Sequence, residues 1–130
     1  MGALYWQLND IWPAPTWASL EFGGKWKMSH YFMRNIFDNL LLVPYEENET
    51  LKVAVIRDDY SGSLTFNLSI KVLKWSSLNP TLTAYTIVST EGFSSKIVYE
   101  NSITNVMNSG NCLDRRECLI EVIYFETQMA

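Results

Sequence analysis

Four residues near the start of the sequence, Trp6, Asn9, Asp10 and Trp12, carry side chains that suit the binding of a sugar. An indole ring is a broad apolar plate that can lie against the axial C–H face of a pyranose, and its edge N–H can donate a hydrogen bond. Asn9 and Asp10 can bind sugar hydroxyls, but Asn and Asp are also natural turn and cap residues. Packing in a core or a loop is the other role open to the two tryptophans, and to Trp17 after them.

Acid–base or metal chemistry has little support in the residues around this group. The acids closest to the tryptophans in sequence are Asp10 and Glu21, and Glu21 precedes a Gly-Gly turn where we expect a solvated loop charge. His30, the only histidine, falls on an apolar stripe without a nucleophile motif nearby, so we expect a hydrogen-bonded packing residue. Zinc is not expected, because Cys112 and Cys118 are widely spaced and distant from His30. We assign no catalytic residue and no metal ligand.

Composition narrows the class of protein. A chain of 130 residues with 48% hydrophobic residues is typical of one globular domain and argues against disorder. The net charge of −4 arises after residue 38, and no basic patch is visible, so we expect neither nucleic acid nor membrane as a partner. Met1 is not followed by a basic and then an apolar region, so no signal peptide is expected.

The first 38 residues predict one strand, one loop and one helix. Residues 3–8 form an apolar run that is typical of a buried parallel strand, so Asn9 and Asp10 would sit at its carboxyl end. The prolines at positions 13 and 15 exclude a helix in the segment after this strand, and Gly23-Gly24 predicts a turn. A helix is expected over residues 25–37, with a stripe that packs on the strand. The stripe comprises Trp26, His30, Met33 and Phe37.

From residue 39 the hydrophobic period changes from 3.6 to 2, which predicts a second domain over residues 39–130. We expect strands over residues 40–43, 51–55, 64–72, 82–88, 96–99 and 118–125, and one helical turn over 102–107. Short alternating strands with turns between them are typical of a β-sandwich, which usually has at least seven strands. About six are visible, so we expect a sandwich whose chain is truncated.

Longer motifs in the sequence indicate a resemblance to a known family. The chain resembles the β-mannosidases of glycoside hydrolase family 2, in particular the animal lysosomal type. The resemblance rests on Gly2-Ala3-Leu4-Tyr5-Trp6-Gln7-Leu8-Asn9-Asp10-Ile11-Trp12-Pro13, on Trp17-Ala18-Ser19-Leu20-Glu21-Phe22-Gly23-Gly24-Lys25-Trp26-Lys27, on His30-Tyr31-Phe32 and, less strongly, on Lys74-Trp75-Ser76-Ser77-Leu78 and Gly110-Asn111-Cys112.

The resemblance implies a mixed α and β fold: residues 1–38 as the last strand, loop and helix of a catalytic (β/α)8 barrel, followed by an incomplete immunoglobulin-like β-sandwich. A whole barrel needs about 250 residues, so its upstream strands, and strands downstream of the sandwich, would be missing partners of this chain. The family removes terminal non-reducing β-D-mannose from oligosaccharides with retention and without a cofactor. It implies Trp6 as the floor of the mannosyl subsite, with Asn9, Asp10 and Trp12 as further substrate-binding candidates.

In the resembled family both catalytic glutamates lie on earlier barrel strands, so we expect this chain alone to be inactive. Two alternatives stay open: a stand-alone immunoglobulin-like binding module, and a related family 2 exo-glycosidase with another sugar. A lysosomal route would favour a disulfide between Cys112 and Cys118 over free thiols. Two sequons, at Asn48 and Asn67, fit the same route.

Overall fold

The computed structural model describes residues 4–126, apart from the side chains of Leu78 and Glu126. The chain divides into two compact units, Met1–Asp38 and Asn39–Ala130. This boundary is the one at which the hydrophobic period changes in the sequence. In the described part of the chain, no helix has the length and apolar character needed to cross a membrane.

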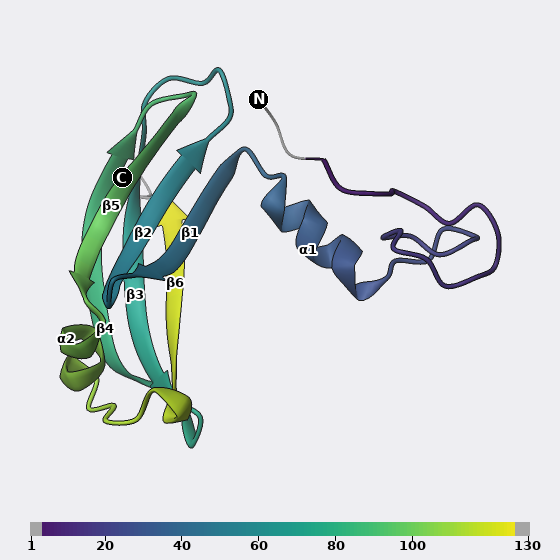
Figure 1. Cartoon of the computed structure of the whole chain (residues 1–130). Helices are drawn as coiled ribbons and strands as arrows, with labels where there is room; N and C mark the ends of the chain where they lie inside the picture. Colours follow the sequence, from purple (N-terminus) through teal and green to yellow (C-terminus); the bar gives the residue numbers. More distant parts are fainter. Residues whose placement is uncertain (1–3, 127–130) are drawn as a thin grey trace. The chain divides into compact units, whose positions relative to one another are not determined.

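The second unit is built mainly of antiparallel β-sheet (Figure 1). Its described elements are, in chain order, β1 (Leu40–Glu47), β2 (Thr50–Arg57), β3 (Leu64–Lys74), β4 (Ser77–Thr90), β5 (Ser94–Ser102), α2 (Ile103–Ser109), the 3₁₀ helix η1 (Arg115–Glu117) and β6 (Cys118–Glu126). One three-stranded sheet has the order β1-β2-β5 and the other β4-β3-β6, so the chain passes between the sheets after β2, after β4 and after β5. The six strands predicted for this unit are confirmed, with longer bounds than the sequence indicated.

One hydrophobic core is shared by both sheets. Every second residue of β2 and of β3 points into it, as the alternation in the sequence predicts, and α2 adds three more side chains. Its buried members include Leu51, Val53 and Val55 of β2, Phe66, Leu68, Ile70 and Val72 of β3, and Ile103, Val106 and Met107 of α2. Burying one large apolar side chain stabilises a fold by roughly 1.5–3 kcal/mol, so this core is the main source of the unit's stability.

Two strands extend through prolines that lie outside their predicted bounds, 40–43 and 82–88. β1 continues past Pro44 to Glu47, and β4 begins at Ser77 and includes Pro80. Both are edge strands, so a proline can be tolerated where the missing N–H does not interrupt a ladder. Asn48 and Glu49 alone connect β1 to β2, and both have positive φ.

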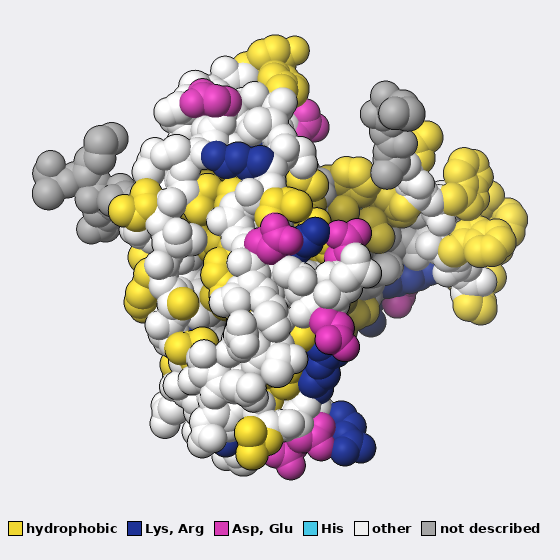
Figure 2. All heavy atoms as spheres, turned by 60° about the vertical axis from the view of Figure 1, so that its left-hand side comes forward, with side chains coloured by type: hydrophobic (Ala, Val, Ile, Leu, Met, Phe, Trp, Pro, Cys, Tyr) yellow, Lys and Arg dark blue, Asp and Glu magenta, His cyan; other side chains and the backbone are white. Residues whose placement is uncertain are grey.

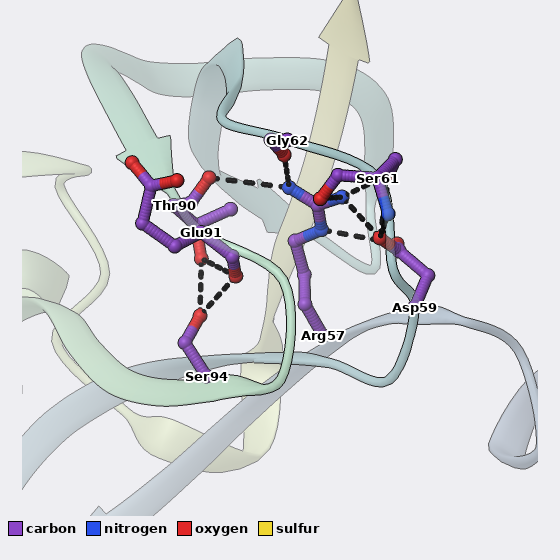
Figure 3. A network of polar contacts seen from close by, with 7 residues as sticks. All are labelled: Arg57, Asp59, Ser61, Gly62, Thr90, Glu91 and Ser94. Atoms are coloured by element: carbon purple, nitrogen blue, oxygen red, sulfur yellow. Dashed lines mark hydrogen bonds and ion pairs between the residues drawn. The ribbon is translucent and has the colours of Figure 1, made fainter.

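A buried arginine fixes the loops at one end of the second unit (Figure 3). The Arg57 side chain is 1% exposed and pairs with the Asp59 carboxylate at 2.5 Å. Its Nη1 donates to the carbonyls of Gly62 at 2.9 Å and of Thr90 at 3.1 Å. Arg57 thereby ties the β2–β3 loop to the end of β4. These hydrogen bonds satisfy a charge that would otherwise be costly to bury.

The first unit differs from its prediction. Helix α1 (Met28–Ile36) is shorter than the expected 25–37, and none of its residues is buried. The strand predicted over residues 3–8 is wrong for residues 4–8, which have no strand structure, and residue 3 lies outside the described part. A strand exists only through its ladder, and no described segment forms an extended ladder with this run.

Charges on the molecule are mixed in sign. The face in Figure 2 shows Lys and Arg side chains next to Asp and Glu, and apolar side chains at several points between them. Ion pairs of the second unit include Lys71–Glu121 at 3.0 Å and Arg115–Glu46 at 2.9 Å. Such exposed pairs contribute little to stability, so most of the free energy that holds this unit together comes from its core.

Candidate functional site

The candidate site lies in the first unit, where two short stretches run side by side. The Leu20 N–H donates to the Leu8 carbonyl at 2.9 Å, and the Asp10 N–H donates to the Leu20 carbonyl at 2.9 Å. Asn9 and Leu20 thus form an isolated parallel bridge, and Leu20 also bridges Trp26 in the antiparallel sense. Gly23 and Gly24, both with positive φ, make the turn between Leu20 and Trp26, as the sequence predicts.

The tryptophans of this unit are exposed. Trp6 is 73% exposed, Trp12 56% and Trp17 81%, so none of the three is sealed inside a core. The Trp6–Gln7 peptide bond is cis. Sugar stacking requires an indole that a ligand can reach, and the exposure of these three side chains meets that condition.

Asp10 is buried and already paired. Its Oδ2 accepts from Lys27 Nζ at 2.8 Å, and Thr16 Oγ1 donates to its Oδ1. The hydrogen bond from Lys27, then that from Thr16, holds the pKa of Asp10 below its ordinary value. The carboxylate therefore stays ionised and is unsuited to donate a proton. Of the two roles open in the sequence, this geometry favours loop support for Asp10.

Asn9 differs from Asp10 in being open to solvent. The Asn9 side chain is exposed, and its Nδ2 donates to the Asp10 carbonyl at 3.2 Å.

Further hydrogen bonds hold the loop after Asp10. Thr16 Oγ1 accepts from the Ala18 N–H at 3.0 Å, and Lys27 Nζ donates to the Thr16 carbonyl at 3.1 Å. Asp10, Thr16 and Lys27 together close the loop that carries Trp12. We call these three residues the loop clasp.

A serine and a histidine lie within hydrogen-bond distance but do not form a nucleophilic pair. Ser19 Oγ is 2.9 Å from His30 Nδ1, and it also donates to the Leu8 carbonyl at 3.1 Å. Ser19 is 1% exposed, and its oxygen lies 3.1 Å from the Tyr5 hydroxyl, so no reacting carbon can reach it. The prediction that His30 is a hydrogen-bonded packing residue is confirmed, and Trp26 packs against its ring.

An open hollow of ≈ 490 Å³ adjoins the loop clasp. Its polar lining comes from Asp10, Thr16, Glu21 and Lys27, and its apolar lining from Pro13, Ala14, Pro15 and Phe22. Glu21 is exposed, as the sequence predicts. Among residues 4–126, no three His, Cys, Asp or Glu side chains gather in a way that could hold a metal ion.

Sequence reasoning missed two members of the loop clasp. Thr16 and Lys27 lie six and seventeen positions after Asp10, spacings that correspond to no helix or strand period. Their contacts depend on the path of the loop, so no signal in the sequence could have found them.

The remaining predicted positions lie in the second unit. The structure joins Cys112 and Cys118 in a disulfide with a Cα–Cα distance of 6.4 Å. Asn48 is an exposed residue of the β1–β2 turn, whereas Asn67 lies within β3, the central strand of its sheet. The two sequons therefore stand in very different surroundings.

The curated relatives that this chain matches are β-mannosidases. It is 40% identical over 129 residues to "Beta-mannosidase" of Mus musculus, covering 98% of this chain and 14% of that protein. "Beta-mannosidase" of Bos taurus is 53% identical over 78 residues, 60% of this chain and 9% of that protein. "Beta-mannosidase A" of Aspergillus niger is 46% identical over 63 residues, 47% of this chain and 7% of that protein. No protein-family model matches.

A solved structure shares the fold. The crystal structure of Beta-D-Mannosidase from Dictyoglomus thermophilum superposes with a TM-score of 0.77 at 19% identity, over 93% of this chain and 14% of that one. At that identity the match concerns the fold, a mainly β structure with two helices. The resemblance seen in the sequence is confirmed: the chain is a homologue of one segment of the β-mannosidases and spans 14% of the length of its mouse relative.

Proposed function

We propose that this chain is a segment of a retaining β-mannosidase, an enzyme that hydrolyses terminal non-reducing β-D-mannose residues of glycoprotein oligosaccharides. The chain supplies a sugar-stacking wall, with Trp6 as its main element. The observation that carries the proposal is that Trp6 stands 73% exposed in a segment homologous to these enzymes. A tryptophan there that packed only within its own unit would be covered.

The hydrolytic carboxylates belong to other parts of the whole enzyme. Retaining hydrolysis needs an acid and a nucleophile about 5–5.5 Å apart. Asp10 is held ionised by Lys27 and Thr16, and Glu21 is an exposed loop residue. A carboxylate held ionised is unsuited to act as the general acid, and the motifs of the family assign no catalytic role to Asp10 or Glu21. The two glutamates expected in the family are therefore supplied by barrel strands outside this chain.

The first unit is the last βα unit of the catalytic (β/α)8 barrel. Its apolar residues support this assignment, because Leu4, Leu8, Phe32 and Ile36 are all more than half exposed. Neighbouring strands and helices of a barrel would cover such residues. The second unit is an immunoglobulin-like β-sandwich, which is supported by two antiparallel sheets that share one core.

Within the sugar pocket we assign Trp6 to stacking, and Asn9 and Trp12 to further contacts with the substrate. Asp10 acts through the loop clasp, which sets the position of Trp12. No cofactor is required by this chemistry. The enzyme follows the secretory route to the lysosome, which the Cys112–Cys118 disulfide and the two sequons support.

A chimeric enzyme tests the proposal. The matched 129-residue segment of the mouse Beta-mannosidase is replaced by this chain, and hydrolysis of an aryl β-mannoside is measured. We expect activity in the chimera and none from the purified chain. Trp6→Ala should lower kcat/KM at least about tenfold, since loss of one stacking contact amounts to roughly 1.4 kcal/mol. Trp17→Ala is the matched control and should change it little.

Turnover by the purified chain would refute the assignment of the catalytic carboxylates elsewhere. An unchanged kcat/KM for the Trp6→Ala chimera would refute the stacking role.

A second candidate function is a stand-alone immunoglobulin-like binding module. The self-contained core of the second unit favours it. It predicts that residues 39–130 alone unfold cooperatively and that removing residues 1–38 leaves binding intact. The matches to β-mannosidases cover the first unit as well, since 98% of the chain aligns with the mouse relative, and this favours the first proposal.

A further inference from the structure

The outer face of the β4-β3-β6 sheet has an unusual distribution of side chains. Residues directly opposite each other in antiparallel strands share a face. The register places Asn67 of β3 between Ile87 of β4 and Phe125 of β6, and Ser69 between Tyr85 and Ile123. The opposite face of β3 carries the core residues, so these side chains lie on the outer surface of the sheet.

This face is polar at both ends and apolar in the middle. Thr65 and Ser89 are hydrogen-bonded at 2.8 Å at one end, and Lys71 pairs with Glu121 at the other. Between them Tyr85 is 66% exposed, Ile87 72% and Phe125 43%. We call Tyr85, Ile87, Ile123 and Phe125 the aromatic patch. Tyr85 and Phe125 meet edge to face, with ring centroids 6.0 Å apart.

A glycosylation sequon, Asn67-Leu68-Ser69, runs through the centre of the aromatic patch. In the folded chain Leu68 and Ser69 are fully buried, and Ser69 Oγ has no hydrogen-bond partner among the described atoms. A hydroxyl without a partner is unfavourable in the fold, so folding does not explain a serine at this position. Sequon recognition needs a Ser or Thr there.

The order of synthesis leaves this sequon accessible. Both partner strands of β3 follow it in the chain, β4 at Ser77–Thr90 and β6 at Cys118–Glu126. A chain that emerges from its amino end therefore exposes residues 67–69 before either neighbour exists to cover them.

We propose that Asn67 carries an N-linked glycan whose first sugar covers the aromatic patch. Asn67 Nδ2 attacks the anomeric carbon of a lipid-pyrophosphate-linked oligosaccharide. The carbon–oxygen bond to the pyrophosphate breaks, the lipid pyrophosphate leaves with the electron pair, and a base takes one Nδ2 proton. The amide keeps its other N–H and its carbonyl oxygen for contacts within the protein.

The aromatic patch suits this occupant. An N-acetylglucosamine ring has an apolar C–H face that can lie on the Tyr85 and Phe125 rings, while its hydroxyls and acetamide stay in water. Asn48 offers no such surface, because it stands in the two-residue turn between β1 and β2. A glycan there would project into solvent.

The inference rests on the secretory route proposed above, and its test is independent of mannosidase activity. The full chain is secreted from mammalian cells with an added signal peptide, in a Thr50→Ala background that removes the other sequon. Peptide mass spectrometry should find a glycan on Asn67. Hydroxyl-radical footprinting should then show oxidation of Tyr85 and Phe125 at least threefold slower than after enzymatic release of the glycan. Tyr60 and Phe93, an exposed pair on other loops, should be unaffected by the release.

Ser69→Ala is the matched variant. It removes the sequon and leaves Asn67 intact, and it deletes a hydroxyl that has no partner. Made in bacteria, the variant should unfold at the same or a higher urea concentration than the unsubstituted chain. Secreted, it should lack the glycan and show the fast oxidation of Tyr85 and Phe125. An unmodified Asn67 in the secreted chain, or a glycan whose release leaves these oxidation rates unchanged, would overturn the proposal.

Discussion

The two units of this chain are organised on opposite principles. The second unit buries a continuous apolar core, with Phe66, Leu68 and Val53 fully inaccessible. In the first unit the described hydrophobic residues are mostly exposed, and Ala18 is the one that is buried. Its inward-facing groups are polar: Asp10 and Ser19 are buried, and each is held by hydrogen bonds.

This contrast has a direct consequence for stability and function. Apolar burial is strong and non-directional, so the second unit can stand as a scaffold. The loop clasp and the Ser19–His30 contact are directional and individually weak. They define the path of one loop without supplying much free energy of unfolding. The exposed aromatic residues of the first unit are therefore available to a ligand or to other parts of a larger enzyme.

The largest expected effect comes from the core of the second unit. Phe66→Ala removes a fully buried ring that packs against Tyr124 at 5.5 Å between centroids. We expect the free energy of unfolding to fall by about 3–5 kcal/mol, measured by urea denaturation. The control is Phe32→Ala in α1, where the ring is 60% exposed, and this change should stay within about 0.5 kcal/mol.

Equal losses from the two phenylalanine substitutions would contradict the contrast between the units. Such a result would mean that α1 is packed against apolar surface in solution.

The strands of the second unit were predictable because their signal is local. Leu64, Phe66, Leu68 and Ile70 alternate with polar residues in the sequence, which is typical of a strand with one buried face. In the structure the side chains of this series face the core. The predicted end of β1 before Pro44 was wrong for an equally physical reason. Whether a proline ends a strand depends on whether that strand lies at an edge, and sheet order is not contained in a local pattern.

In the first unit the same reasoning failed for residues 4–8, and the sugar-binding role of the site residues stays a prediction. An apolar run signals burial, but burial needs neighbours, and the described chain provides no ladder for it. Residue type and family motif selected Trp6 and Asn9 as candidates, and the structure shows that both are exposed. Lys27, the partner of Asp10, was not, because a contact between loop residues has no period.

A second test concerns a close approach in the scaffold. Gly110 follows α2, and a Cβ placed there would lie 2.6 Å from Val72 Cβ in the core. Gly110→Ala should cost about 1–3 kcal/mol of unfolding free energy through overpacking, again by urea denaturation. Gly62→Ala is the control, since no atom lies within 4 Å of its added Cβ. A variant with the Gly110 substitution that is as stable as the control would show that α2 can shift at no cost.

A third test uses pH at the loop end of the second unit. Hydrogen bonds from Arg57, then from Ser61, hold the pKa of Asp59 below its ordinary 3.8. A lowered pKa means that the ion pair contributes its full stability above the ordinary value and loses it as pH falls through the folded value. Asp59→Asn should therefore unfold more easily than the unsubstituted chain at neutral pH, and the difference in urea midpoint should shrink below pH 3.8. A difference that persists in acid would assign the effect to packing.

The smallest effect is expected at Asp10, in the unit held by directional contacts. Its pKa is also lowered, mainly by Lys27, so the loop clasp should stay closed at neutral pH and open as pH falls through the folded value. Asp10→Asn should leave the urea midpoint of the second unit unchanged, because no core residue is involved. It should shift the indole N–H resonance of Trp12, on the loop that the clasp closes, and remove the acid-induced movement of that resonance. Lys27→Met should shift the same resonance, because it removes the partner of the same carboxylate. A Trp12 resonance that is indifferent to both substitutions would separate the loop clasp from the proposed sugar-stacking wall, which would then depend on the residues around Trp6 alone.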